Sequence, residues 1–446
     1  MHFELESDIL WVMKLQKDPP QIAILTTFPN RTAARDGKGY SAIGWHSKKM
    51  IDALSKKLAL RVYAEKLTNK NCVDDKMLNF ELKRVWEKGS PLSLLKVFGD
   101  IWKSAQINTI YIQFEFNVFG GMKSNMILPF LFLISKFFGK RVVLELHQVV
   151  NNFTAISPHL GMNKKISQLF FGTGLKIYYY LMIASSSHII VFEKSLQNKL
   201  SSFFVSKNKV SISHLFTSTN HNRKYKIKRS KRFQVLIFGY LNWYKGVDWA
   251  AEAFAKYGRV TDNIQLLIAG GANPYHENKL YYHKFLAHMK SISGKNANIS
   301  QIGFVKEENV LSTFQKCDLV ILPYRVFFSA SGPFSLALTT HTPVILSEKL
   351  LPYCENPDFL QAMNESDIKK NQLFFPLDMK RFYLKILLIK NDRNELEKLV
   401  QFSKNLFQKR IADILIDDYV SILLPLKNKG LIAKFNDLKT NWQITS

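Results

Sequence analysis

Two segments about eighty residues apart share one strand–loop–helix pattern, and this pattern constrains the fold more than any other feature of the sequence. Residues 236–248 read LIFGYLNWYKGVD: an apolar run, a glycine turn and a Lys–Gly pair before an amphipathic segment. Residues 317–345 read CDLVILPYRVFFSASGPFSLALTTHTPVI, with a Ser/Gly-rich loop between two apolar runs. Such loops direct backbone N–H groups and a cation toward one point, which is how helix N-termini bind phosphate. The pair predicts one diphosphate-bearing ligand held between two loops of an α/β domain.

Short apolar runs alternate with longer periodic segments along the whole chain, as is typical of parallel sheets covered by helices. A chain of 446 residues with this pattern predicts an α/β protein of two Rossmann-like, doubly wound domains. The expected strands are residues 21–28, 58–65, 109–116, 141–147, 188–194, 233–240, 264–271, 317–324 and 342–347. The expected helices are residues 41–57, 125–138, 175–184, 247–257, 281–292 and 308–316.

The boundary between the two domains is expected at residues 223–232, RKYKIKRSKR, the most charged and least apolar stretch of the chain. This gives an N-terminal extension (1–19), a first domain (20–222), a basic linker (223–232), a second domain (233–425) and a helical tail (426–446). The tail is expected to cross back to the first domain.

The positive charge is the compositional outlier, at a net +27, and it is unevenly placed. Residues 1–222 carry +14, the ten residues of the linker carry +7, and the remainder carries +6. Such a field attracts anionic lipid surfaces, nucleic acid or phosphorylated substrates. A generally basic proteome or simple solubility would explain the same bias.

Several classes of protein are disfavoured by what the sequence lacks. Its three cysteines have no paired spacing, so neither a zinc site nor a redox motif is expected. There is no GxxxxGK[ST] phosphate loop and no G-x-S-x-G elbow. The first residues are acidic and unlike a signal peptide, and no run approaches about 18 apolar residues, so a cytoplasmic protein is expected. The longest apolar run, residues 126–135, is expected to form a buried or interfacial helix.

The segments FGYLNWYKGVDWAAEAF, CDLVILPY, SASG and TPVI resemble, in order and spacing, the donor-binding segments of glycosyltransferase family 4. Upstream, AILTTFP, YIQFEFNVFGG and VVLELH are similar to the N-terminal strands and acceptor loops of that family. The resemblance covers roughly residues 20–425. It implies the GT-B fold, in which two Rossmann-like domains face each other across a cleft. It also implies a retaining enzyme that moves a hexose from a nucleotide-diphosphate sugar, with UDP- or GDP-sugar as co-substrate, no tightly bound cofactor and no metal.

On this resemblance, the second domain binds the donor. Lys245 would neutralise the leaving diphosphate, a charge that develops late and is therefore catalytically useful. The family often has Arg where this chain has Tyr240, and Arg325 is the candidate substitute for that cation. Two glutamates of the best-known family pattern are replaced by Phe328 and Leu336, so ribose recognition must differ. The remaining candidates for donor binding are small or turn-forming residues: Gly239, Gly270, Ser329, Ser331, Gly332 and Pro333.

The first domain is expected to hold the acceptor. His147 ends an expected strand, where open α/β sheets place ligand residues, and the resemblance implies that it faces the transferred sugar. The acceptor-side candidates are Gly39, Gly44, Glu115, Asn117 and Gly121, together with the neighbouring Gly37 and Gly120. His46 and His214 are expected to be structural histidines.

Two alternatives remain open on the sequence alone. The missing glutamate pair would suit a GT-B relic that scaffolds a glycan-assembly complex without transferring sugar. The charge of +27 would suit a nucleic-acid-binding protein, but no zinc-finger, RRM or basic-helix signature is present. We therefore expect a glycan or lipid-linked acceptor, an anionic membrane surface and no nucleic acid as partners, with the protein at the inner face of the cytoplasmic membrane.

Overall fold

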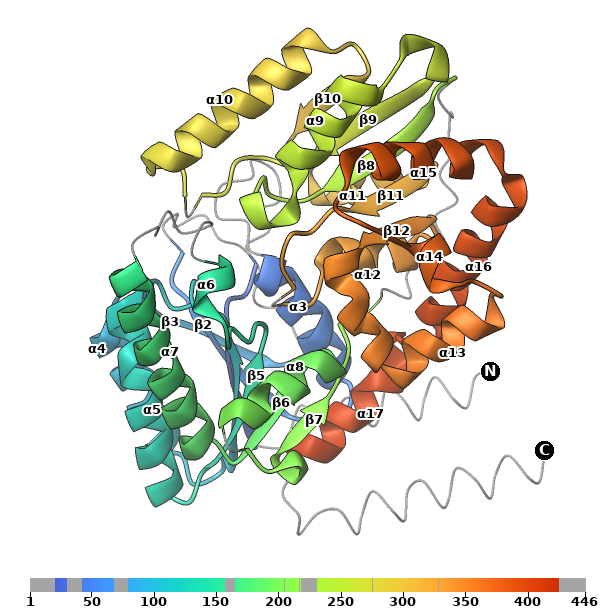
Figure 1. The fold of residues 1–446 in the computed structure, drawn as a ribbon. Helices are drawn as coiled ribbons and strands as arrows, with labels where there is room; N and C mark the ends of the chain where they lie inside the picture. The colour runs from blue at the N-terminus through green and yellow to red at the C-terminus, as the bar shows by residue number, and fades with distance from the viewer. Residues whose placement is uncertain are drawn as a thin grey trace, which may run out of the picture.

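A computed structural model describes residues 21–29, 42–67, 79–156, 165–203, 205–215, 217, 231–274, 276–327 and 329–424. The expected N-terminal extension, most of the basic linker and the expected tail at 426–446 lie outside these residues. Gly37, Gly39 and Phe328 also lie outside them. Within the described chain, two parallel sheets form two α/β domains (Figure 1).

The first sheet has the strand order β3-β2-β1-β4-β5-β6-β7 and every pair is parallel. Its strands are β1 (Ile22–Leu25), β2 (Leu60–Glu65), β3 (Glu81–Trp86), β4 (Thr109–Phe114), β5 (Arg141–Leu146), β6 (His188–Val191) and β7 (Val210–Ile212). The helices that connect them are α3 (Ala42–Leu54), α4 (Pro91–Lys103), α5 (Met122–Phe137), α6 (Phe153–Ile156), α7 (Lys165–Ser185) and α8 (Lys194–Leu200).

The second sheet has the order β10-β9-β8-β11-β12-β13, again all parallel. Its strands are β8 (Phe233–Phe238), β9 (Ile264–Ala269), β10 (Ile299–Gly303), β11 (Leu319–Leu322), β12 (Val344–Ser347) and β13 (Phe374–Phe375). Its helices are α9 (Val247–Tyr257), α10 (Leu280–Lys295), α11 (Glu307–Gln315), α12 (Gly332–Thr339), α13 (Pro357–Glu365), α14 (Lys370–Leu373), α15 (Met379–Asn391) and α16 (Arg393–Lys409).

The central strands are buried on both faces, which is why they read as continuous apolar runs rather than as alternating ones. All residues of β1, β4, β11 and β12 are buried. Each sheet reverses its strand order once, between β1 and β4 and between β8 and β11. Loops diverge at such a switch point and leave room for a ligand at the carboxyl ends of the strands.

Within the described residues, the structure contains every strand and helix expected from the sequence, and the doubly wound α/β fold is confirmed. It also contains strands that were not predicted, among them β3, β7, β10 and β13. These are edge or near-edge strands. β3 reads ELKRVW and only its last residue is buried, so its apolar signal is weak.

A last helix, α17 (Ala412–Leu423), returns to the first domain (Figure 1). It packs on α3, and its buried side chains join a core cluster with β1 and β2. Thr109 donates a hydrogen bond to the carbonyl oxygen of Leu423 at 2.9 Å. The crossing back therefore occurs within the range assigned to the second domain, which puts the expected boundary at residue 425 too late. The return of α17 to the first domain could not be predicted, because its amphipathic pattern does not say which domain its apolar face packs against.

A buried ion cluster joins the domains. Arg410, 3% exposed, lies 3.1 Å from Glu193 of the first domain and 2.7 Å from Asp358 of the second. Nearby, the backbone of Ser329 forms an isolated antiparallel bridge with Gln148. These contacts fix the second domain over the carboxyl edge of the first sheet.

Candidate functional site

A pocket lies between the two domains, at the carboxyl edges of both sheets. The space between its walls, with the open solvent at its mouth included, is about 1030 Å³. We call it the cleft pocket. Residues of both domains line it: Trp45, His46, Lys49, Leu215, Phe238, Gly239, Tyr240, Lys245, Gly270, Gly271, Phe304, Val305, Glu307, Val310, Gly332, Pro333, Ser335, Leu336 and Thr339.

Lys245 is the buried cation of the pocket. It ends a short 3-10 turn, Trp243–Lys245, and is only 8% exposed. Gly246 follows with φ 66°, and a Cβ there would lie 1.9 Å from the carbonyl oxygen of Pro323, so the turn into α9 requires glycine. Among the described residues, the Lys245 ammonium has no hydrogen-bond or ion-pair partner. Burial lowers the pKa of Lys245 to about 8. An unpartnered ammonium in a pocket is suited to an anionic ligand.

Two glycines allow the loops after β8 and β9 to lie close to this ammonium. Gly239 has φ 105°, and a Cβ on it would lie 2.6 Å from the Nζ of Lys245. A Cβ on Gly270 would lie 2.0 Å from the carbonyl oxygen of Gly239, so the loops after β8 and β9 touch through backbone alone. Tyr240, at the position where the family often has Arg, lines the same pocket.

The N-terminus of α12 forms another part of the wall. Gly332 and Pro333 begin the helix and line the pocket. Ser331 caps the helix: its Oγ accepts a hydrogen bond from the backbone N–H of Phe334 and pairs with the Tyr324 hydroxyl at 2.9 Å. Gly332 does not have a positive φ, and an added Cβ would meet no atom within 4 Å. The backbone at this position therefore does not require glycine, while Gly332 lines the pocket as expected.

Two other donor candidates are engaged outside the pocket lining. The Arg325 guanidinium makes two hydrogen bonds of 2.9 Å to Asp248 and a third to the carbonyl oxygen of Trp243. It therefore braces the donor loop against α9, which differs from the expectation of a second phosphate-binding cation. Ser329 lies at the bridge with Gln148.

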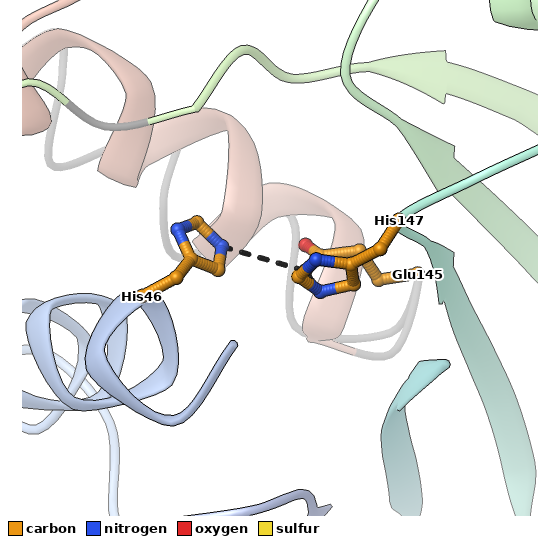
Figure 2. A group of neighbouring side chains, drawn as sticks. All are labelled: His46, Glu145 and His147. Carbon is orange, nitrogen blue, oxygen red and sulfur yellow. Dashed lines mark ion pairs between the residues drawn. The ribbon is translucent and has the colours of Figure 1, made fainter. Parts of the chain in front are cut away.

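The opposite wall of the cleft carries a histidine–glutamate cluster made of His46, Glu145 and His147 (Figure 2). His46 belongs to α3 and lines the pocket. His147 directly follows β5, and its ring lies 5.4 Å from the ring of His46. The Nε2 atoms of His147 and His46 lie 3.0 and 3.5 Å from the Oε1 of Glu145. His46 was expected to be a structural histidine, but it is the member of the cluster that lines the pocket.

Neutral donors complete the shell around Glu145. Its Oε2 accepts hydrogen bonds of 2.5 Å from both Tyr111 and Tyr419, and its Oε1 accepts one of 3.0 Å from Gln113. Burial alone would raise the pKa of Glu145, but hydrogen bonds and charge from His147 and His46 hold its pKa well below its usual value. Burial lowers the pKa of His147, while its contact with Glu145 acts in the opposite direction.

The three residues of the cluster could also hold a metal ion, because their ligand atoms lie within 4.8 Å of one another. Three protein ligands fit an open zinc site better than a closed one. However, both oxygens of Glu145 already accept hydrogen bonds from the phenols and the amide. We therefore interpret the cluster as a device that orients the two histidines.

The acceptor candidates lie beside the cleft pocket, outside its lining. Glu115 follows β4. Burial raises its pKa to about 7, although a hydrogen bond from Asn117 acts in the opposite direction. The charge of Glu115 in turn helps to raise the pKa of Tyr244 in the second domain. Asn117 and Gly121 are exposed, and Gly121, with φ 118°, precedes α5. Gly44 is buried in the first turn of α3. His214 bonds the carbonyl oxygen of Phe192 at 2.8 Å beside the interdomain ion cluster, a structural role as expected.

The sequence interpretation missed several members of this site. Glu145 is two residues before His147, and the period of a strand places both on one face, so this residue could have been found. Lys49 is three residues after His46 on the same helix and could have been inferred from the helical period. Tyr419 could not, because it is 274 residues from Glu145 and depends on the return of α17.

Comparison with known proteins agrees with this geometry. Residues 218–355 match the family model Glycosyl transferases group 1. The match covers part of the range over which the sequence resembles family 4, and it includes both donor loops. No curated protein matches the chain.

Solved structures match the chain over both domains at low identity. Sucrose-phosphate synthase from Thermosynechococcus elongatus has a TM-score of 0.66 at 13% identity, over 93% of this chain and 100% of that one. Anabaena HepE in complex with UDP-glucose has a TM-score of 0.60 at 13% identity, over 90% and 98%. WaaG, a glycosyltransferase involved in lipopolysaccharide biosynthesis, has a TM-score of 0.55 at 13% identity, over 90% and 99%. The GT-B fold is thus confirmed, and with the family match so is the expectation of a glycosyltransferase.

Proposed function

We propose that the protein is a retaining glycosyltransferase that moves a hexose from a UDP- or GDP-sugar to a glycan or lipid-linked acceptor. The observation that carries the proposal is the buried, unpartnered Lys245 ammonium in a pocket whose other wall holds His46. The HepE complex with UDP-glucose supports it, because that protein binds such a donor in the same fold.

The reacting bond joins the anomeric carbon of the sugar to a phosphate oxygen of the donor. As this bond breaks, its electron pair passes to the diphosphate, and negative charge grows there. Lys245 and the backbone N–H groups that begin α12 are placed to stabilise that charge. Because Lys245 is buried, water screens its interaction with the diphosphate less than it would at the surface.

The histidine–glutamate cluster would hold the transferred sugar. The Nε2 of each ring faces the Glu145 carboxylate, and the other ring nitrogen would bond a sugar hydroxyl. Glu115, at the acceptor edge, has a pKa of about 7 and could take the proton released when an acceptor hydroxyl attacks the anomeric carbon. Exclusion of water between the domains would favour transfer over hydrolysis.

The experiment uses the purified full chain with a panel of UDP-, GDP- and ADP-sugars, and mass spectrometry for the released nucleoside diphosphate. We expect slow donor hydrolysis with one nucleotide class, and a loss of about two orders of magnitude in Lys245→Met. The control is Lys256→Met, which neutralises an exposed lysine on α9. No turnover of any donor by the wild type, or equal turnover in both variants, would refute the proposal.

A second candidate is a GT-B scaffold that has lost transfer. The observation that favours it is Leu336, which lines the pocket at a position where the best-known family pattern has an acidic residue. In that case the same panel gives no turnover, while calorimetry with UDP or GDP still detects binding that depends on Lys245.

A further inference from the structure

More than half of the exposed large hydrophobic residues of the described chain lie on α5 and α7 or at the end of α5. The two helices pack side by side on one face of the first sheet (Figure 1). On α5, Met122, Met126, Phe130, Leu133 and Phe137 are all at least 60% exposed and recur every three or four residues. They form one stripe along the solvent side of the helix, opposite the residues that pack on the sheet. The run at 126–135 is thus only half used by the core.

α7 continues this surface. Ile166, Phe170, Ile177 and Tyr180 are more than half exposed and also recur at helical spacing. Phe130, Phe137, Phe138 and Phe170 are 62%, 90%, 52% and 76% exposed. With about 200 Å² for each ring, these four alone expose roughly 500 Å² of apolar surface. These four rings alone reach the size of the largest apolar patch on a typical monomer, about 300–600 Å², and such patches often mark an interaction site.

The charges on the same helices indicate what covers it. α5 and α7 carry four lysines and no aspartate or glutamate. Lys123, Lys165 and Lys176 are exposed, and Lys136 donates a hydrogen bond to the carbonyl oxygen of Ala184 on α7. A second copy of the chain docked through this face would bring lysines against lysines. An anionic lipid surface offers both the apolar depth and the opposite charge.

We propose that the α5–α7 face docks the protein on an anionic bilayer, with the two helices lying in the interface. None of the described helices is long and apolar enough to cross a membrane, so the contact is peripheral. α5 begins directly after Gly121, and Met122 is 65% exposed. The docked face therefore adjoins the loop at residues 115–121, which is our acceptor candidate. This last point rests on the proposed function, whereas the docking itself does not.

The test is flotation of the full chain with vesicles of phosphatidylcholine alone or with phosphatidylglycerol added. We expect binding to the anionic vesicles at low salt and little at high salt, because the Debye length shrinks to about 3 Å at 1 M. Changing Lys123, Lys165 and Lys176 together to Gln should lower the partition coefficient by about two orders of magnitude, roughly fivefold per lysine. Changing Met126, Phe130 and Phe137 together to Gln should abolish binding.

Matched controls lie in the second domain. Val260, Leu280 and Leu388 are 77%, 73% and 65% exposed, and changing them to Gln should leave binding unchanged. Lys256, Lys284 and Lys290 are exposed lysines for the matching charge control. Circular dichroism checks folding, and the affinity for UDP or GDP checks the donor site separately. If the wild type binds neither UDP nor GDP, the proposed function is refuted, while the docking result remains valid.

Three results would overturn docking through this face. The first is that the apolar variant binds vesicles as well as the wild type does. The second is that the second-domain control variants lose as much vesicle binding as the α5–α7 variants. The third is a wild-type dimer in sedimentation that becomes monomeric in the apolar variant, because the face would then belong to a second copy of the chain.

Discussion

The depressed pKa of Lys245 gives the binding of a nucleoside diphosphate a defined pH dependence. Burial lowers this pKa from 10.5 to about 8. A bound diphosphate favours the ammonium, so the ligand binds the protonated form better. Phosphate groups with a pKa near 6 are fully ionised above pH 7.5, so the lysine is the group that titrates there. Affinity should be nearly constant below pH 7.5 and fall about tenfold for each unit above pH 8.

The same shift has a consequence for stability. In the unfolded chain Lys245 keeps its ordinary pKa of 10.5, so between pH 8 and 10.5 the unfolded state holds a proton that the native state has lost. The free energy of unfolding therefore rises with pH across this window. Below pH 8 the full cost of burying the charge applies, about 3 kcal/mol for a shift of this size. Lys245→Met should accordingly melt at a higher temperature than the wild type at pH 7 without ligand.

Calorimetric titration of the nucleotide that binds, between pH 7 and 9.5, tests this reasoning. Lys245→Met should bind more weakly by about 2 kcal/mol at pH 7, as expected for a lost charge-assisted contact, and should show no slope. The exposed-lysine variant Lys256→Met should retain both affinity and slope. A slope that survives in Lys245→Met would assign the titration to another group and refute the argument.

Three further perturbations probe the frame around the pocket. Gly270→Ala should weaken nucleotide binding at least tenfold, because the new Cβ would lie 2.0 Å from a backbone oxygen of the neighbouring donor loop; Gly294→Ala, whose Cβ meets no atom within 4 Å, should bind normally in the same titration. Arg410→Met should lower the free energy of unfolding in denaturant by about 3–5 kcal/mol because it removes the buried cation between Glu193 and Asp358, whereas Arg393→Met, which breaks an exposed pair, should cost less than about 0.5 kcal/mol. Tyr419→Phe should reduce kcat and shift its pH profile while leaving the Kd for the nucleotide unchanged, because it removes one donor to the carboxylate of the histidine–glutamate cluster; an unchanged profile would show that the phenol is only structural.

Local patterns in the sequence were sufficient for the fold class and for the donor loops. The buried strands β8 and β11 each precede a loop with glycine or serine, and their parallel pairing brings both loops to one edge. Lys245, Gly239, Gly270 and Gly332 meet in the cleft pocket for this reason. The association of His147 with one wall of the cleft follows in the same way from its position after β5.

What the sequence could not give depends on long-range packing. The engagement of Arg325 by Asp248 is set by the position of α9 against the loop after β11, and no local pattern encodes it. The share of Tyr419 in the cluster depends on α17 crossing between domains. The exposure of the apolar stripe on α5 was also hidden, because a half-buried and a fully buried apolar helix have similar sequences.

The central claim is that one nucleotide sugar is held between the donor loops and the α3 wall. Hydrogen exchange followed by mass spectrometry, with and without a saturating donor sugar, tests it most directly. We predict slower exchange together in residues 236–248, 330–339 and 42–54, and no change in α10 and α15. Slower exchange confined to the second domain, or found only outside these segments while calorimetry reports binding, would contradict the claim.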